Sequence, residues 1–403
     1  MLKSLELFAG AGGLVLGTEL AGFKSVAAVE WDRWAAETLA ENRGRGYPLV
    51  RDLRVICGDV RSLDYTQFPS DLDLLSGGPP CQPFSIGGKH RAYNDDRDMF
   101  SAFAEALAKL KPRAFIIENV KGLTRSTFAN YLAYIEHRVS LPEVAPKPGE
   151  VWPEHLKRLE QEKGSHGDKG VEYVTFRHLY NAADLGAAQK RERVFIVGFR
   201  TDQSVQWHHP TYTHSQDELL YSQWISGEYW DRHEVSKKAR GEAPSRLKGR
   251  LDVLRSRNFK SDLQPWRTVR DALEGLPEPD PKGRETPGVL NHHLQPGARS
   301  YVGHTGSPID WPSKALKAGD HGVPGGENMM VLPDGSVRYF TVREAARLQG
   351  FPDGYVFHGA WSETMRQLGN AVPVMLAQAV ASSVAQKLLE SDLQNLARVS
   401  RLN

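Results

Sequence analysis

The sequence predicts an α/β protein whose core is a doubly wound, mostly parallel sheet, joined to a smaller and irregular second domain. In the first 200 residues, short apolar runs alternate with helical patterns, an order typical of βαβ units. The runs are rich in β-branched residues and lack polar alternation, which favours strands covered on both faces. From about Thr201, Trp, His, Gly and Pro become common and the alternation ends. We therefore expect residues 1–200 and a C-terminal helix at 365–403 to form one domain, and residues 201–364 the smaller one.

The composition excludes several classes of protein. With 40% hydrophobic and 25% charged residues among 403, the chain fits neither a disordered nor a fibrous protein. It has no apolar run of about 18 residues, so we expect no membrane span, and the segment after Met1 lacks the apolar region of a signal peptide. Two cysteines, Cys57 and Cys81, are too few for a disulfide framework or a cysteine-based zinc cluster. They suit a reducing compartment, so we expect a cytoplasmic protein.

Six segments have the length and composition of buried strands. They are Leu5–Phe8, Ser25–Val29, Val55–Cys57, Leu72–Leu75, Ala114–Ile117 and Val194–Phe199. Helical patterns are clearest in Met99–Leu110, in Val342–Gln349 and from Met365 onwards, whereas Leu141–Gly170, rich in Pro, Glu and Lys, is expected to be a surface insertion. Ligands of such sheets bind just beyond the carboxyl ends of the strands. Residues that follow the strands are therefore the first candidates for a functional site.

The first strand runs into the glycine turn Gly10-Ala11-Gly12-Gly13. Glycines let the backbone approach a ligand, and the helix that follows presents its N-terminus to a carboxylate or phosphate. The second strand ends in Glu30, about 20 residues further on, where such folds hold a ribose hydroxyl. Val15 occupies the third glycine position of the dinucleotide fingerprint, so an ordinary tight turn is the alternative. With Glu30 in place a nucleoside-type cofactor is favoured, and Asp59, after the third strand, is a candidate contact for an adenine amino group.

The segment Pro79-Pro80-Cys81-Gln82-Pro83 follows the fourth strand. Prolines fix φ and exclude both helix and sheet, so we expect the thiol to be presented rather than packed. A lone cysteine is otherwise most often a small buried hydrophobe, and Cys57, between apolar neighbours in a strand, is expected to be one. Cys81 is therefore a candidate nucleophile.

Glu118 ends the next strand, and Arg191 and Arg193 precede the last one. Consecutive strands are usually neighbours, so Cys81 and Glu118 are expected to face one site. A carboxyl that ends a buried strand costs free energy unless it is paired or protonated, although a solvated strand end is the alternative. The two arginines form either a solvated edge or contacts to an anion or a polarised carbonyl. Together these groups favour nucleophilic catalysis with acid assistance.

The net charge of +2 conceals a basic segment between Arg232 and Arg270, where 12 Lys and Arg stand against 4 Asp and Glu. Such a segment suits contacts with nucleic-acid phosphates, or it is a solvated helical surface. Glycine-rich loops with His, Asn and Thr lie within Asn291–Val337; they suit hydrogen bonds to base edges or are plain surface loops. The pairs His208-His209 and His292-His293 lack carboxylate or cysteine partners, so no metal site is expected.

Several blocks follow one another along Leu5–Arg200 and Arg338–Ala381. They are Phe8-Ala9-Gly10-Ala11-Gly12-Gly13, Glu30-Trp31, Pro79-Pro80-Cys81-Gln82, Glu118-Asn119-Val120, Gln189-Lys190-Arg191-Glu192-Arg193, Arg343-Glu344-Ala345-Ala346-Arg347-Leu348-Gln349-Gly350-Phe351-Pro352 and Gly369-Asn370-Ala371-Val372-Pro373. In this order they resemble the DNA cytosine-C5 methyltransferase family, and a set of blocks in register is far more specific than any one of them. The resemblance implies the Rossmann-like fold of S-adenosylmethionine-dependent methyltransferases and, in the middle region, a target-recognition domain.

The resemblance implies methyl transfer from S-adenosylmethionine to C5 of a cytosine flipped out of double-stranded DNA. In that chemistry a thiolate adds to C6 of the base, the activated C5 takes the methyl group, and loss of the C5 proton then releases the thiol. Cys81 matches the nucleophile, and Glu118 the carboxyl that holds N3 and the exocyclic amine. Arg193 matches a contact with the base carbonyl, and Arg191 a contact with anions of the site.

Two sets of contact residues follow from the resemblance. Those expected to border S-adenosylmethionine are Phe8, Gly10, Gly12, Glu30, Trp31, Asp59, Val60, Pro80, Phe100, Asn370 and Val372. Those expected to contact DNA are Ser85, Lys89, Arg91, Tyr301, His304, Thr305, His321 and Asn328. Some members carry a serine that contacts a phosphate where this chain has Gly87, so Lys89 or Arg91 is expected to supply that contact.

The resemblance is to bacterial enzymes that protect host DNA from a restriction endonuclease of the same specificity, and it implies a monomeric, nucleoid-associated enzyme. Three alternatives stay open. A tRNA cytosine methyltransferase shares the fold but usually carries a Cys-Phe-Thr block in its second half, and no cysteine follows Cys81. A Rossmann-fold oxidoreductase would use Cys81 as a redox thiol and bind nicotinamide or flavin. A DNA-binding relative without catalysis would have no need of Cys81 and Glu118.

Overall fold

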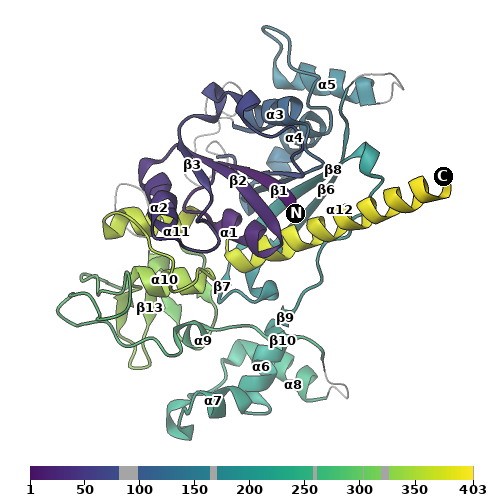
Figure 1. Cartoon of the computed structure of the whole chain (residues 1–403). Helices are drawn as coiled ribbons and strands as arrows, with labels where there is room; N and C mark the ends of the chain where they lie inside the picture. The colour runs from purple at the N-terminus through teal and green to yellow at the C-terminus, as the bar shows by residue number, and fades with distance from the viewer. Residues whose placement is uncertain (81–98, 164–169, 257–260, 303, 319–325, 403) are drawn as a thin grey trace. The chain divides into compact units, whose positions relative to one another are not determined.

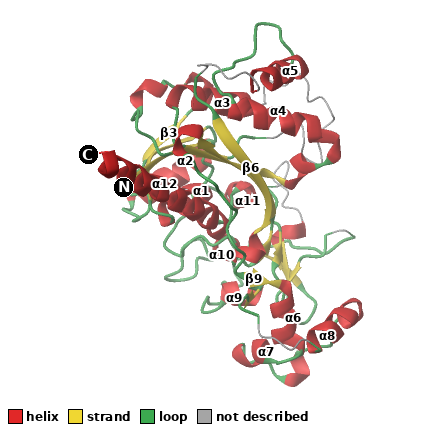
Figure 2. Cartoon of the chain, turned by 90° about the vertical axis from the view of Figure 1, so that its right-hand side faces the viewer, coloured by secondary structure: helices red, strands yellow, loops and turns green. Residues whose placement is uncertain are grey.

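The computed structural model describes residues 1–80, 99–163, 170–256, 261–302, 304–318 and 326–402. The chain divides into two compact units. The first comprises Met1–Tyr180, Glu192–Pro210 and Ala377–Asn403, and the second Asn181–Arg191 and Thr211–Leu376. Figure 1 labels many of the helices and strands, and Figure 2 separates helices from strands by colour.

The first unit contains a seven-stranded sheet with the order β3-β2-β1-β4-β5-β8-β6. Its strands are β1 (Leu2–Leu7), β2 (Phe23–Glu30), β3 (Arg54–Cys57), β4 (Leu74–Gly77), β5 (Ala114–Val120), β6 (Tyr173–Asn181) and β8 (Glu192–Arg200). All pairs from β3 to β5 are parallel, and β8 runs antiparallel to β5. This arrangement confirms the predicted doubly wound, mostly parallel sheet.

Helices cover both faces of this sheet. They are α1 (Gly13–Leu20), α2 (Arg33–Gly44), α3 (Met99–Leu110), α4 (Ala129–Ser140), α5 (Trp152–Lys163) and α12 (Val374–Leu402). One face packs on α3 and α4, where Phe103 and Ile135 join Leu5 and Phe115 of the sheet in the main hydrophobic cluster. On the other side, α1 lies against α12 so closely that a Cβ on Gly17 would come within 2.3 Å of Ala377 (Figure 1). The helix predicted at Met99–Leu110 is confirmed.

Three local expectations need correction. The strand β6 was not predicted, because it lies at an edge of the sheet and mixes buried with exposed positions. The predicted burial of Cys57 is wrong: its thiol is exposed, since β3 forms the opposite edge. The insertion Leu141–Gly170 is more than a surface loop, because it contains α5, whose Leu159 is buried in the main cluster.

The second unit is built from short elements. Its strands are β7 (Gln189–Lys190), β9 (His214–Ser215), β10 (Gln264–Pro265), β11 (Ser307–Pro308), β12 (Ser313–Lys314), β13 (Met329–Val331) and β14 (Val337–Tyr339). Its helices are α6 (Gln216–Trp224), α7 (Glu228–Arg232), α8 (Lys248–Arg255), α9 (Val269–Leu273), α10 (Val342–Leu348) and α11 (Trp361–Asn370). In its described part, no sheet has more than three strands.

The block that begins at Arg343 stabilises the second unit from within. The Arg343 side chain is fully buried and donates to the carbonyl oxygens of Leu290, Pro352 and Tyr355 at 3.0, 3.0 and 2.7 Å. Three acceptors satisfy a cation that would otherwise be costly to bury. The helix predicted at Val342–Gln349 is confirmed as α10.

Within the described residues, one helical stretch, Trp361–Ala397, meets the length and composition of a membrane span. It comprises α11 and most of α12. Because 67% of its most apolar window is buried in the structure, it has the character of a core helix, and the finding is weak evidence for a membrane.

Candidate active site

Polar side chains gather on one face of the sheet near the carboxyl ends of its strands. Side chains alternate along a strand, so residues next to those of the main hydrophobic cluster point to the opposite face. The polar row on that face consists of Glu30 of β2, Glu6 of β1, Ser76 of β4, Glu118 of β5 and Arg193 of β8. The row therefore includes two residues that the sequence predicted for catalysis and one predicted for the cofactor.

Glu118 and Arg193 form a buried ion pair. Arg193 Nε lies 2.7 Å from Glu118 Oε1, and the two side chains are 13% and 9% exposed. The antiparallel register of β5 and β8 brings them together, since Val120 lies opposite Arg193. Burial lowers the pKa of the Arg193 guanidinium, and the Glu118 carboxylate opposes that change. The solvated strand end and the solvated edge considered for these residues are therefore wrong.

The chain leaves β4 towards Cys81 beside Glu118. A Cβ on Gly78 would lie 3.1 Å from Glu118 Oε2, so the carboxylate rests against the start of this segment. The buried Asn119 amide donates to the carbonyl oxygen of Pro79 at 2.9 Å and holds the chain two residues before Cys81. No role for Asn119 was predicted from the sequence, although it follows Glu118 directly in the block Glu118-Asn119-Val120.

Five of the predicted site residues lie outside the described residues, and His321 of the second unit is one of them. The other four are Cys81, Ser85, Lys89 and Arg91. Their assignments therefore remain predictions from the sequence.

The glycine turn has the backbone geometry of a close ligand approach. Phe8, Gly10 and Gly12 all have positive φ, of 55°, 53° and 91°. In the non-glycine Phe8 this conformation is strained, which is characteristic of functional turns. Glu30 fixes the turn, because its carboxylate accepts from the backbone N–H groups of Gly10 and Asp32, each at 2.6 Å. Each oxygen keeps a lone pair for a ligand hydroxyl.

The burial of Glu30 raises the pKa of its carboxyl, and the backbone hydrogen bonds from Asp32 and Gly10 oppose that rise. Next to it, Trp31 is 66% exposed, which is unusual for so large an apolar ring. Asp59 begins the short helix η1 (Val60–Ser62). Exposed aromatic surface beside an acceptor carboxylate suits a planar base that carries an amino group.

The other predicted cofactor contacts occupy varied positions. Val60 and Phe100 are buried in the main hydrophobic cluster, whereas Pro80 is exposed. Asn370 and Val372 belong to the second unit, at the end of α11.

Glu6 is a buried acid that the sequence reasoning missed. The Ser76 hydroxyl donates to Glu6 Oε2 at 2.8 Å. Burial raises the pKa of Glu6 to about 8 against the effect of that hydrogen bond, and the negative charges of Glu118 and Glu30 raise it further. At neutral pH this carboxyl is therefore protonated, which reduces the repulsion among three acids on one face. The signal in the sequence was an acid in a strand that alternates with leucines.

Two predicted contact residues, Arg191 and Asn328, bond to backbone groups of the second unit. The Arg191 side chain is buried and donates to the carbonyl oxygens of Leu316 and Gly369 at 2.8 and 2.6 Å. The buried Asn328 amide bonds the backbone N–H and carbonyl of Lys317, both at 3.1 Å. The anion contact of Arg191 and the DNA contact of Asn328 remain predictions from the sequence.

Three of the remaining candidates for DNA contact, Tyr301, His304 and Thr305, lie at one turn of the second unit. Tyr301 and His304 close the turn with two backbone hydrogen bonds, and their ring centroids are 4.4 Å apart. The Thr305 hydroxyl accepts from Lys314 Nζ at 2.9 Å. Tyr301 is exposed, whereas His321 lies outside the described residues. The DNA contacts of this turn remain a prediction.

Comparison with known proteins agrees with the arrangement of the large sheet. Residues 2–139 and 157–386 match the family model described as C-5 cytosine-specific DNA methylase. The chain is 31% identical over 390 residues to the type II methyltransferase M.PspPI of Psychrobacter. The aligned region covers 95% of this chain and 79% of that protein. It is 28% identical to the type II methyltransferase M.NgoPII of Neisseria gonorrhoeae, with 96% of each covered. The solved structure of the S. pombe Dnmt2 methyltransferase has the same fold, with a TM-score of 0.55, 18% identity and coverage of 96% and 99%. The chain belongs to the family of C-5 cytosine-specific DNA methylases.

Proposed function

We propose that this protein transfers a methyl group from S-adenosylmethionine to C5 of a cytosine within a specific double-stranded DNA site. The observation that carries the proposal is the buried pair of Glu118 and Arg193 beside the segment that leads to Cys81. A carboxyl and a guanidinium held side by side in a buried site can bind the amidine-like edge of cytosine and its carbonyl at once. Family membership supports the same substrate.

In this proposal the Cys81 thiolate adds to C6 of the flipped cytosine. Glu118 holds N3 and the exocyclic amine while charge develops on the ring, and Arg193 contacts the base carbonyl. Asn119 positions the segment of Cys81 through the carbonyl of Pro79. Once C5 carries the transferred methyl group, the proton at C5 leaves and the thiolate is eliminated from C6, which restores the aromatic base.

The residues at the glycine turn fit S-adenosylmethionine, which supplies the methyl group. The positive φ of Gly10 and Gly12 brings backbone close to a ligand. Among the described residues, apart from its chain neighbours, no heavy atom lies within 4 Å of a Cβ built on Gly10. The hydrogen-bonded Glu30 carboxylate and the exposed Trp31 ring support this proposal. In it Glu30 accepts from ribose hydroxyls, and Trp31 and Asp59 contact adenine. We assign the first unit to catalysis and the second to target recognition.

The named relatives are type II methyltransferases. We propose that this protein likewise belongs to a restriction–modification system and shields DNA from an endonuclease of the same specificity. In that role it acts as a cytoplasmic, nucleoid-associated monomer.

The proposed activity is tested by incubating the protein with S-adenosylmethionine labelled in its methyl group and with either duplex DNA or tRNA. We expect label in DNA, and bisulfite sequencing of DNA from expressing cells to reveal one methylated site. Label in tRNA alone would overturn the DNA assignment in favour of the tRNA methyltransferase. A purified protein with a bound flavin or nicotinamide would contradict methyl transfer altogether.

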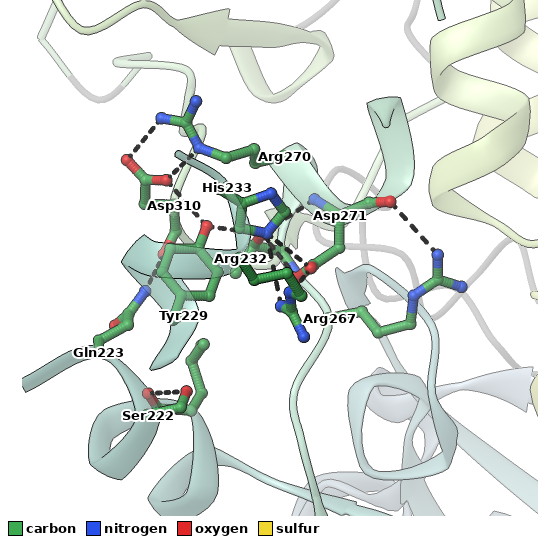
Figure 3. Close-up of polar contacts among 11 residues, drawn as sticks. Ser222, Gln223, Tyr229, Arg232, His233, Arg267, Arg270, Asp271 and Asp310 are labelled. Atoms are coloured by element: carbon green, nitrogen blue, oxygen red, sulfur yellow. Dashed lines mark hydrogen bonds and ion pairs between the residues drawn. The ribbon is translucent and has the colours of Figure 1, made fainter. Parts of the chain in front are cut away.

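The basic segment divides into paired arginines and exposed cations. Figure 3 shows Arg232 and His233 directed at Asp271, and Arg270 at Asp310. Ion pairs to aspartates also engage three further arginines of the segment, Arg240, Arg250 and Arg255. Lys237, Lys238, Arg246 and Lys248, in contrast, are exposed and form no ion pair with a described carboxylate. We infer that these four residues, the basic face, contact DNA phosphates.

Replacing all four residues of the basic face by alanine is expected to weaken DNA binding and to make its affinity depend less steeply on salt concentration. Each lost phosphate contact reduces the slope of log K against log salt by about 0.9. Phosphate contacts carry no sequence information, so the methylated site should not change. Fluorescence anisotropy at several salt concentrations measures the slope, and Lys147→Ala with Lys157→Ala, two exposed lysines of the first unit, serves as control. An unchanged slope would identify a solvated surface.

A further inference from the structure

Arg61 connects two of the proposed cofactor contacts. Its Nε lies 3.1 and 3.0 Å from the two carboxylate oxygens of Asp59, and its Nη2 lies 2.7 Å from Oδ2. Its Cζ lies 6.0 Å from the centroid of the Trp31 ring, within the range of a cation–π contact. Arg61 has no part in the proposed methyl transfer.

The pairing fixes the charge and the direction of the Asp59 carboxylate. The Arg61 side chain holds the pKa of Asp59 below its ordinary value, and the backbone N–H of Arg61 donates to Oδ1 at 2.9 Å. A carboxylate offers about four acceptor positions, so Asp59 can still accept from a further donor. An amino group on a planar base can be that donor, whereas a carbonyl oxygen in the same place is repelled by the Asp59 carboxylate.

We propose that Arg61 is a positioning residue for the adenine of S-adenosylmethionine: it orients Asp59 to accept from the 6-amino group and borders the base beside the exposed Trp31. The inference rests on the proposed function, because it requires that cofactor. Arginine suits the task because its planar fork holds both carboxylate oxygens and can stack on an aromatic ring. Lysine keeps the positive charge beside Asp59 but has neither the fork nor the planar surface.

A purely structural role for the pair makes a different prediction. The Arg61 and Asp59 side chains are 46% and 21% exposed, and pairs this close to solvent contribute little to stability. Removal of Arg61 should therefore leave the melting temperature nearly unchanged. Its effect should appear in the discrimination between bases.

The test compares the binding of two product analogues, S-adenosylhomocysteine and S-inosylhomocysteine, which carries a carbonyl in place of the 6-amino group. Calorimetry gives both dissociation constants, and quenching of tryptophan fluorescence follows the base at Trp31. We expect Arg61→Ala to weaken the adenosine ligand about tenfold, as for a lost charge-assisted hydrogen bond. The inosine ligand should change less than about twofold, and Arg61→Lys should be intermediate. Arg45→Ala, which removes another surface arginine paired to a glutamate, should bind as the wild type does.

The outcomes separate this inference from the function on which it rests. Wild-type protein that binds neither ligand would overturn the proposed cofactor and the role of Arg61 together. Wild-type protein that prefers adenosine, with the same preference in Arg61→Ala, would overturn the role of Arg61 alone. Equal weakening of both ligands in that variant would also overturn it, because the effect would then not involve the amino group.

Discussion

Replacing Cys81 by serine is expected to abolish the covalent complex between this protein and DNA that contains 5-fluorocytosine. Fluorine at C5 cannot leave as a proton does, so a thiolate that has added to C6 stays attached after methyl transfer. Serine is a far weaker nucleophile at neutral pH, and methyl transfer should fall at least about a thousandfold. A denaturing gel with labelled DNA measures the adduct, which should form only with S-adenosylmethionine present.

Cys57 provides a matched control for the trapping experiment. It is the other cysteine of the chain, and its thiol is exposed at the end of β3. Cys57→Ser should form the adduct as the wild type does. An adduct that persists in Cys81→Ser, or one that Cys57→Ser lacks, would refute Cys81 as the nucleophile.

Glu118→Gln is expected to produce the second large effect, on both turnover and stability. Turnover should fall about a hundredfold or more, because the carboxyl that holds the ring is lost. The variant also leaves the buried Arg193 without its carboxylate partner, and breaking such a pair costs about 3–5 kcal/mol. Single-turnover kinetics at saturating DNA and thermal unfolding measure the two effects separately.

Two further variants test the interpretation of the Glu118 result. Glu192→Gln removes an exposed carboxylate from the same strand as Arg193, where it pairs with Lys121, and should change neither quantity by much. The double variant Glu118→Gln/Arg193→Met removes both charges and should regain stability without regaining turnover. A Glu118→Gln protein with wild-type turnover would contradict the proposed role of the carboxyl.

Local chemistry made the central part of the fold and of the site predictable. Buried parallel strands are short and apolar, so six of the seven strands could be located, although their ends were displaced by one to several residues. Glu118 and Arg193 stand next to such strands, and a charge in that position requires a partner. Edge positions are different, since β6 and Cys57 depend on what lies beside them in the sheet, which the sequence of a strand does not contain.

Roles that depend on distant segments could not be predicted. Arg191 and Arg193 are two residues apart, yet one bonds the carbonyls of Leu316 and Gly369 and the other a carboxylate. The residue type specifies a donor but not its acceptor. A count of charges within the basic segment likewise does not show which of its cations are paired with acids elsewhere in the chain. Asp217 and Asp310, which neutralise two of its arginines, lie outside the segment.

The length of β1 is as constrained as its composition. Leu5, Glu6 and Leu7 alternate between the apolar cluster and the polar row, so the deletion of one residue in the strand would exchange the two faces. A carboxyl would then enter the apolar cluster. Inserting two residues into the natural strand would keep each side chain on its face. It would, however, move the glycine turn forward by about 6.6 Å and separate Gly10 from Glu30. The first strand thus acts as a spacer of defined length, and variants that differ in length should be tolerated only ahead of Leu2.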